Sequence, residues 1–312
     1  MLLAPDTVVP YLRARGLLHG DATASELGGG VSNVVLAVRG PEVRLLVKQS
    51  LPRLRVEDEW LAKRERALAE AAALEALAAI DPEPVPRLLD LDAEACALTT
   101  ELAPDGWRAW KDLLLDGEVD AEVARRLGRV LASWQRAPVP PGFEDVEAFV
   151  QLRVDPYHRT LARRRPELAA PVLSCAERLL SDRWCLVHGD FSPKNVLVGD
   201  GRLWVIDLEV AHLGNGVFDV AFMLNHLFLK AIHHPRDAAG LRACALAFRD
   251  EVAPRDERDA LAHVGCLMLA RVHGKSPAEY LGARGRAAAN ALGESLLADP
   301  PPSLEAAWER LA

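Results

Sequence analysis

Three features are scarce in this sequence: aromatic residues, paired cysteine motifs and long apolar runs. Aromatic residues make up 5% of the 312 residues, so we expect a core of leucine, valine and alanine. The five cysteines are odd in number, widely spaced and lack a Cys-x-x-Cys, which argues against a disulfide framework or a structural zinc site. No stretch approaches the ~20 apolar residues that span a bilayer. We therefore expect buried, reduced thiols and no membrane partner.

A basic leader and a surplus of positive charge are also missing. Met1 to Asp6 contain no basic residue and include an acid, which does not fit a signal peptide. We therefore expect a cytoplasmic protein. The 37 basic and 45 acidic residues give a net charge of −8, so no nucleic-acid partner is expected from the overall charge. An apolar fraction of 50% is typical of globular proteins, and the length allows two domains.

Hydrophobic periodicity divides the chain into a β-rich part and a helical part. Alternating residues at 34–38 and 43–47 predict a hairpin, helical spacing covers 56–80, and short strands return within 87–102. Ala103-Pro104-Asp105-Gly106 breaks the pattern. The remainder predicts helices at 108–115, 119–136, 144–152, 156–164, 167–181, 217–234, 237–250, 256–273 and 277–297, with a β island at 185–210. We predict domains at 1–103 and 104–312, with a ligand site in the cleft.

The β island carries the most informative motif. Asp190 and Asn195 lie in His188-Gly189-Asp190-Phe191-Ser192-Pro193-Lys194-Asn195 between two strands, and Asp207 ends the next strand. A hairpin would let Asn195 and Asp207 face each other, and their oxygens are ligands that Mg²⁺ prefers. Asp190 would remain free to accept a proton from a substrate hydroxyl. This order of a base and two metal ligands is that of phosphoryl transfer, although each Asp alone is more often a turn or cap residue.

These residues resemble a known family. The segment from His188 to Asn195, and Ile206-Asp207-Leu208-Glu209, look like the catalytic loop and metal motif of the aminoglycoside phosphotransferase and choline kinase-like superfamily. The resemblance implies an α+β, bilobal, protein-kinase-like fold with ATP and Mg²⁺ as cofactors. It implies that Asp190 is the catalytic base and that Asn195 and Asp207 bind Mg²⁺. It also implies that Asp219 braces the catalytic loop, and His188 is expected to hold that loop by hydrogen bonds.

The N-terminal part is consistent with the same resemblance. Backbone amides of the glycine-rich segment, with Gly29, Gly30 and Ser32, would approach phosphates, although such a run alone is often only a flexible turn. Lys48, at the end of the second strand, would hold the α- and β-phosphates. Its carboxylate partner would be Glu70, with Glu65 as the second choice. The main-chain carbonyl of Glu101 and N–H of Ala103 would bind the adenine edge.

For four further residues, the sequence leaves two possible roles open. Lys194 would touch a phosphate or face solvent. Glu209 would help to bind or orient a metal. Asp155 would bind a cationic acceptor or, more in keeping with Asp-Pro, cap the following helix. Arg271 would bind an anionic group on the acceptor or form a salt bridge at a helix end.

The sequence therefore predicts an ATP- and Mg²⁺-dependent kinase that phosphorylates a hydroxyl of an aminoglycoside-, choline- or sugar-like small molecule. One alternative is a nucleotide-binding pseudokinase that acts as an interaction module. The joint presence of Lys48, Asp190, Asn195 and Asp207 argues against it. Another is a metal-dependent phosphohydrolase, which would need further ligands close to Asp190, and none are evident in the sequence.

Overall fold

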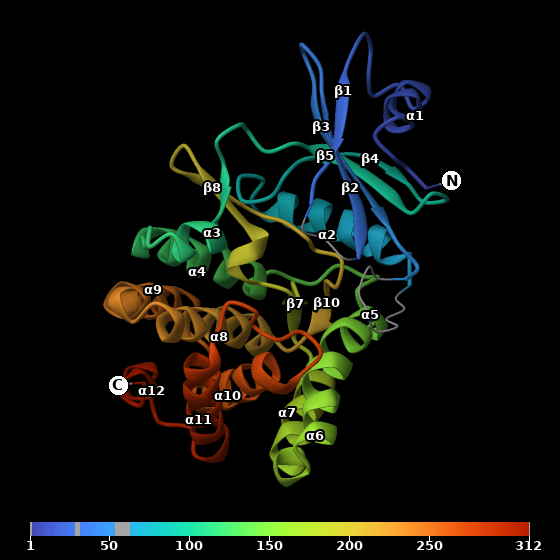
Figure 1. The fold of residues 1–312 in the computed structure, drawn as a ribbon. Coiled ribbons are helices and arrows are strands. Elements are labelled where there is room, and N and C mark those ends of the chain that lie inside the picture. Colours follow the sequence, from blue (N-terminus) through green and yellow to red (C-terminus); the bar gives the residue numbers. More distant parts are fainter. Residues whose placement is uncertain (1, 29–31, 54–62, 312) are drawn as a thin grey trace. The chain divides into compact units, whose positions relative to one another are not determined.

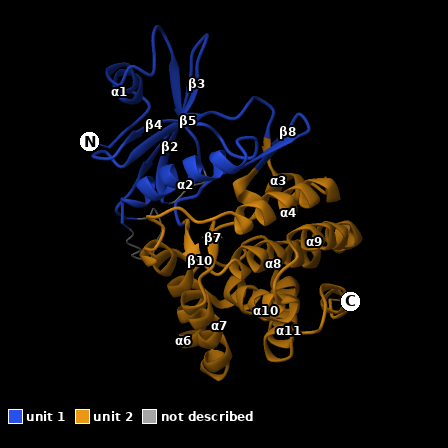
Figure 2. Ribbon diagram, turned by 180° about the vertical axis from the view of Figure 1, so that it is seen from behind, with its two compact units in different colours: residues 1–107, 197–210 blue, residues 108–196, 211–312 orange. Residues whose placement is uncertain are grey.

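The computed structural model describes residues 2–28, 32–53 and 63–311, and the chain falls into two compact units (Figure 2). The first unit comprises residues 1–107 and 197–210, and the second comprises 108–196 and 211–312. Residues 197–210, which we expected in the second domain, group with the first unit. The domain boundary at 103 stays a prediction.

A five-stranded sheet forms the centre of the first unit (Figure 1). Its strand order is β1-β2-β3-β5-β4, and every neighbouring pair is antiparallel. The predicted hairpin is confirmed as β2 and β3, where Arg39 pairs with Arg44 across the turn. The strands are β1 (Thr23–Glu26), β2 (Asn33–Arg39), β3 (Arg44–Ser50), β4 (Leu88–Asp92) and β5 (Ala97–Glu101). Because β3 continues to Ser50, Lys48 lies within the strand and not at its end.

In the part of the first unit that the structure describes, two helices and a second hairpin accompany the sheet. Helix α1 (Val8–Ala14) contributes Leu12 to a core shared with β2 and β3. Helix α2 (Arg66–Ile80) packs against β3, β4 and β5 (Figure 1). We predicted this helix from residue 56, and its expected first turns lie outside the described residues. The hairpin of β8 (Val196–Gly199) and β9 (Arg202–Val205) turns through Asp200 and Gly201, both at positive φ.

The second unit is mainly helical, as predicted. Helix α8 is central, because every residue from 217 to 231 is buried, and α9, α10 and α11 pack against it (Figure 1). The elements are β6 (Arg108–Ala109), α3 (Trp110–Leu115), α4 (Ala121–Arg136), α5 (Glu147–Phe149), η1 (Val150–Arg159), α6 (Thr160–Arg164), η2 (Pro166–Leu168), α7 (Ala169–Ser181), β7 (Cys185–Val187), η3 (Pro193–Asn195), β10 (His212–Gly214), α8 (Val217–His233), η4 (Pro235–Asp237), α9 (Ala238–Val252), α10 (Glu257–His273), α11 (Ala283–Ala298) and α12 (Leu304–Glu309).

The expected break between helices near residue 155 is wrong. Element η1 is a π-helix of 10 residues that runs through Asp155 and Pro156 and joins α5 to α6. Asp155 is therefore not the N-cap that we expected; its carboxylate pairs with Arg159 at 2.6 Å. The wider turn of a π-helix accommodates the missing N–H of Pro156 without ending the helix.

Burial agrees with the composition. All five cysteines are free and buried, as expected. The buried hydrophobic set is dominated by leucine, valine and alanine. Among the residues described, no helix combines the length and apolar character needed to cross a membrane.

Candidate active site

Lys48 is held in the middle of the sheet by strands on both sides. Its backbone pairs with Val35 of β2 and Leu98 of β5, and its side chain is buried. The ammonium lies 2.7 Å from one carboxylate oxygen of Glu70 and 3.0 Å from the other. Glu70 is on the buried face of α2. The structure therefore brings together the Lys48–Glu70 pair that we predicted, whereas Glu65 lies at the N-cap of α2.

Asp207, which lies 159 residues after Lys48 in the sequence, also contacts the Lys48 ammonium. It follows β9, and its Oδ1 accepts a hydrogen bond from the Lys48 ammonium. Burial alone would lower the pKa of Lys48, but the charges of Asp207 and Glu70 outweigh it and raise that pKa above its ordinary value. Asp207 has a φ of 69°, a left-handed conformation that is unfavourable for a residue with a Cβ. This backbone conformation accompanies the approach of its carboxylate to Lys48.

Glu209 is bound by a set of donors that the sequence analysis did not identify. Its Oε1 accepts from the Ser32 hydroxyl at 2.9 Å, and its Oε2 accepts from Asn33 Nδ2 at 2.8 Å and Arg66 Nε at 2.9 Å. Arg66 also donates to the carbonyl oxygens of Ser32 and Leu51. Arg66 thus ties the segment after the glycine run to the segment after β9. Its position at the start of an alanine-rich helix was the available signal for it, but the sequence offers Arg64 beside it.

The remaining predicted residues of the first unit are main-chain candidates. Gly29 and Gly30 lie outside the described residues. Glu101 ends β5, its carbonyl accepts from the Thr100 hydroxyl, and its carboxylate pairs with Arg87. The carbonyl of Ala103 accepts from Arg44 at 3.1 Å. Among the described residues, no backbone partner is found for the N–H of Ala103.

In the second unit, Asp219 fixes the backbone before Asp190. The fully buried Asp219 carboxylate accepts from the His188 N–H at 2.7 Å and from the Gly189 N–H at 2.9 Å. Burial raises the pKa of Asp219 to about 7, against the lowering effect of these two hydrogen bonds. His188 Nδ1 accepts from the Asp190 N–H at 3.1 Å. The structure thus brings His188 and Asp219 to the backbone of the loop, and their bracing roles stay predictions.

Asp190 itself is buried between two cations. Arg153 Nη2 and Lys194 Nζ each lie 2.8 Å from its Oδ2. Arg153, on η1, also donates to the Gly189 carbonyl at 2.6 Å. The Lys194 side chain is half-exposed. Lys194 is recognisable from its motif, whereas Arg153 is not, because nothing in residues 150–159 indicates a contact with a loop 36 residues further along.

Asn195 ends the loop at the start of β8. Its Nδ2 donates to the Asp190 carbonyl at 3.0 Å, which leaves its carbonyl oxygen without a hydrogen bond among the described residues. This bond closes the loop from Asp190 to Asn195. The predicted Mg²⁺ ligand therefore has an oxygen that is not used in holding the loop.

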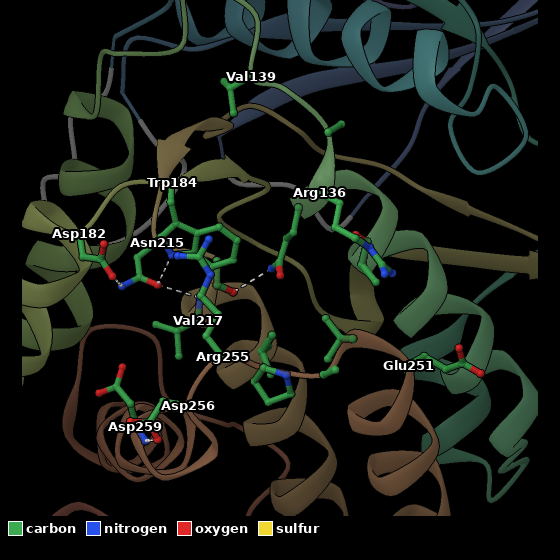
Figure 3. A pocket seen from close by; sticks show the side chains of 18 of the residues that line it. Arg136, Val139, Asp182, Trp184, Asn215, Val217, Glu251, Arg255, Asp256 and Asp259 are labelled. Atoms are coloured by element: carbon green, nitrogen blue, oxygen red, sulfur yellow. Dashed lines mark hydrogen bonds between the residues drawn. The ribbon is translucent and has the colours of Figure 1, made fainter.

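A pocket of about 680 Å³ lies elsewhere in the second unit (Figure 3). The Arg255 guanidinium stacks over the Trp184 ring at 3.5 Å, and the Trp184 indole donates to Asn215. Asp182, Asp256 and Asp259 also line it. None of the predicted site residues lines this pocket, so it is separate from the candidate active site.

The sequence signature of the phosphotransferase enzyme family matches residues 23–256, well over half of the chain. The chain belongs to the phosphotransferase enzyme family. The match includes both the Lys48–Glu70–Asp207 cluster and the loop around Asp190. The family that the motifs resemble is thereby confirmed.

The chain is also similar to individual proteins, at lower sequence identity. The chain is 28% identical over 258 residues to the methylthioribose kinase of Yersinia pestis (strain Pestoides F), covering 70% of the chain and 63% of that kinase. It therefore spans less than two thirds of that relative. A choline/ethanolamine kinase family protein from Mesorhizobium loti has a TM-score of 0.57 at 15% identity, with 98% of each chain covered. Aminoglycoside-3'-phosphotransferase of type VIII has a TM-score of 0.55 at 21% identity, covering 85% of this chain and 98% of the other. These two likenesses confirm the predicted α+β fold.

Proposed function

We propose that this phosphotransferase family member is an ATP- and Mg²⁺-dependent kinase that phosphorylates a hydroxyl of a small molecule. The observation that carries the proposal is the buried contact of Lys48 with both Glu70 and Asp207. Burying a lysine and two carboxylates costs desolvation free energy. Groups of this kind are therefore found mainly at functional sites. The sequence match to a methylthioribose kinase favours a sugar-like acceptor.

The residues present fit a divalent metal ion. Carboxylate oxygens of Glu70, Asp207 and Glu209 lie within 4.8 Å of one another. Arg66 engages Glu209, and Lys48 contacts both Glu70 and Asp207. On the motif resemblance, we assign Asp207 as a metal ligand and the carbonyl oxygen of Asn195, which holds no part of its loop, as a second. Mg²⁺ would neutralise the negative charge that develops on the transferred phosphoryl group.

The other residues of the first unit would hold the nucleotide. Lys48 would donate to the phosphates, and Glu70 would keep its ammonium in place. The Ser32 hydroxyl, next to the glycine run, is oriented by Glu209. The unpartnered N–H of Ala103 would bind the adenine edge together with the carbonyl of Glu101. These roles require donors that are positioned before the ligand binds. Glu70 positions the Lys48 ammonium, and Glu209 positions the Ser32 hydroxyl.

Asp190 would orient the acceptor hydroxyl and take its proton. Its backbone is held by His188, and its carboxylate by Arg153 and Lys194. The two cations, each 2.8 Å from its Oδ2, fix the orientation of the carboxylate. Lys194, half-exposed, could turn from Asp190 to a phosphate. Catalysis would then consist mostly of positioning and charge stabilisation.

Two measurements test this proposal. An ADP-release screen with methylthioribose, aminoglycosides and amino alcohols should give turnover that Asp190→Ala abolishes and that Asp6→Asn, an exposed control, leaves intact. Thermal shift with MgATP should show stabilisation that Lys48→Met and Asp207→Asn reduce and Asp190→Ala retains. ATP stabilisation without turnover on any acceptor would favour a pseudokinase and contradict the proposal.

A further inference from the structure

Lys230 is a buried lysine without a negative partner. It lies on α8, is 1% exposed, and forms no ion pair with any carboxylate in the described part of the chain. Its Nζ lies 5.8 Å from the centre of the Tyr280 ring. Burial, followed by the charges of Lys111 and Arg271, lowers the pKa of Lys230 to about 7, and the exposed Asp112 only partly opposes this. A lysine is seldom buried in this way unless something supplies the missing negative charge.

Arg271, in the last turn of α10, is incompletely satisfied as well. Its Nη1 donates to the Ser276 hydroxyl at 2.7 Å and to the Tyr157 hydroxyl at 3.4 Å. Its Nε is buried and has no hydrogen-bond partner within the described residues. It pairs with no carboxylate there, so the salt bridge that we expected at this helix end is not formed. Both partners of Arg271 are neutral hydroxyls, which leaves its charge uncompensated.

Two more donors lie in the same region. The Tyr280 hydroxyl is buried and has no hydrogen-bond partner among residues 2–28, 32–53 and 63–311. Burial raises the pKa of Tyr280 to about 12, so the phenol remains a neutral donor. His226, one turn before Lys230 on α8, is also buried. Burial and the charges of Lys230 and Arg271 lower the pKa of His226 well below its ordinary value. The cluster of Lys230, Arg271, Tyr280 and His226, hereafter the cationic cluster, therefore holds donors and no acid.

The cationic cluster is linked to Asp190 through η1. Arg153 and Tyr157 are four residues apart on this helix; Arg153 pairs with Asp190 at 2.8 Å, and Tyr157 accepts from Arg271 at 3.4 Å. Burial alone would raise the pKa of Tyr157, but the charges of Arg271 and Arg153 lower it, and the charge of Asp190 opposes them. One turn of η1 thus connects the residue that we propose as the base to the unpaired cations.

We propose that the cationic cluster binds an anionic group of the acceptor, a carboxylate or a phosphate, while the acceptor's hydroxyl is presented to Asp190. The inference rests on the proposed function and adds the class of substrate. A carboxylate or phosphate oxygen would supply the counter-charge for Lys230 and Arg271 and accept from the unpartnered Tyr280 hydroxyl. A purely cationic acceptor would meet repulsion from the same residues.

Anion binding is tested first without ATP. Inorganic phosphate and acetate are titrated against the full chain in thermal-shift and calorimetric experiments, with chloride used to hold the ionic strength constant. At least one of the two anions should raise the Tm of the wild type in a saturable manner. Lys230→Met and Arg271→Leu should each weaken that binding at least tenfold, whereas Arg242→Met, which removes an exposed cation from α9, should not change it.

Two controls make this result decisive. If Lys230→Met does not fold, Tyr280→Phe, which removes one hydroxyl, should weaken anion binding several-fold while the protein remains folded. If Lys230→Met folds, its Tm without anion should equal or exceed that of the wild type, because it removes an uncompensated buried amine. Saturable binding that survives both Lys230→Met and Arg271→Leu, or no binding of either anion, would overturn the inference.

The acceptor class is tested with matched pairs that differ only in the anionic group. ADP release is compared for gluconate against sorbitol and for glucose 6-phosphate against glucose, which separates carboxylate from phosphate recognition. At least one anionic member should have the higher kcat/KM, and Lys230→Met should remove the difference. Turnover that is equal within both pairs overturns the inference but leaves the kinase intact. Anion binding with no turnover on any acceptor contradicts the kinase proposal and not the anion site.

Discussion

Arg66 Nε donates to Glu209 Oε2 at 2.9 Å, and the two residues are 143 positions apart in the sequence. The side chain of Arg66 is fully buried and that of Glu209 is 5% exposed. This pair joins the start of α2, the segment at Ser32 and Asn33, and the segment after Asp207. It therefore fixes, within the first unit, the positions of residues proposed to bind the nucleotide.

Breaking this pair from one side should be strongly destabilising. Arg66→Met leaves the Glu209 carboxylate buried without its cation, and we expect a loss of about 3–5 kcal/mol in the free energy of unfolding. Urea denaturation measures the loss. Arg129→Met, which removes a half-exposed partner of Glu122, should change stability by less than about 1 kcal/mol. Equal effects of the two variants would show that Arg66 does not hold these segments together.

Asp219→Asn should impair turnover more than nucleotide binding. The amide can accept from one of the two N–H groups of His188 and Gly189 but presents its own N–H₂ to the other, so we expect a stability loss of about 1–3 kcal/mol. The displaced loop should lower kcat while the Kd for ATP changes little. Steady-state kinetics and nucleotide titration provide the two readouts, with exposed Asp6→Asn as the control. An unchanged kcat would exclude a bracing role for Asp219.

Two buried histidines should make the second unit sensitive to acid. Burial lowers the pKa of both His158 and His263 to about 3. The backbone of Arg153 only partly opposes this at His158, and the Asp259 carboxylate lies 3.7 Å from His263 Nε2. Because the unfolded chain binds these protons near pH 6.5 and the folded chain does not, their contribution is fully present above pH 6.5. It is lost as the pH falls toward 3.

At pH 5.5 the expected loss is about 1.4 kcal/mol for each histidine relative to pH 7.5. Urea denaturation at the two pH values measures it. His158→Leu and His263→Leu should each reduce the loss by about 1.4 kcal/mol, and exposed His19→Leu should not reduce it. A pH dependence that is the same in all four proteins would show that the buried histidines are not its source.

Local sequence patterns predicted most of the fold. Alternating apolar residues predicted the β2–β3 hairpin, and apolar residues at helical spacing predicted the central helices, because these patterns reflect which face of each element is buried. Local patterns did not predict structure that depends on contacts between segments far apart in the sequence. The π-helix η1 follows from contacts of residues 150–159 with neighbouring helices, and the short elements β10 and α12 lie below the length at which periodicity is informative.

The candidate site was predictable to a similar extent. Lys48, Glu70 and Asp207, and the pair His188 and Asp219, carry recognisable spacing, and the structure places each of these groups together. Arg66 and Arg153 were missed because an arginine in a helix carries no mark of the acid that it meets far along the chain. The same applies to Lys230, whose burial no local pattern indicates.

The most direct test of the central claim is ³¹P NMR of ATP incubated with the protein, Mg²⁺ and an acceptor that gives turnover in the screen. The account predicts one new phosphomonoester for each ADP formed, with the signal lost in Asp190→Ala. Free phosphate formed in place of the ester, or an ester that Asp190→Ala still produces at the wild-type rate, would contradict it.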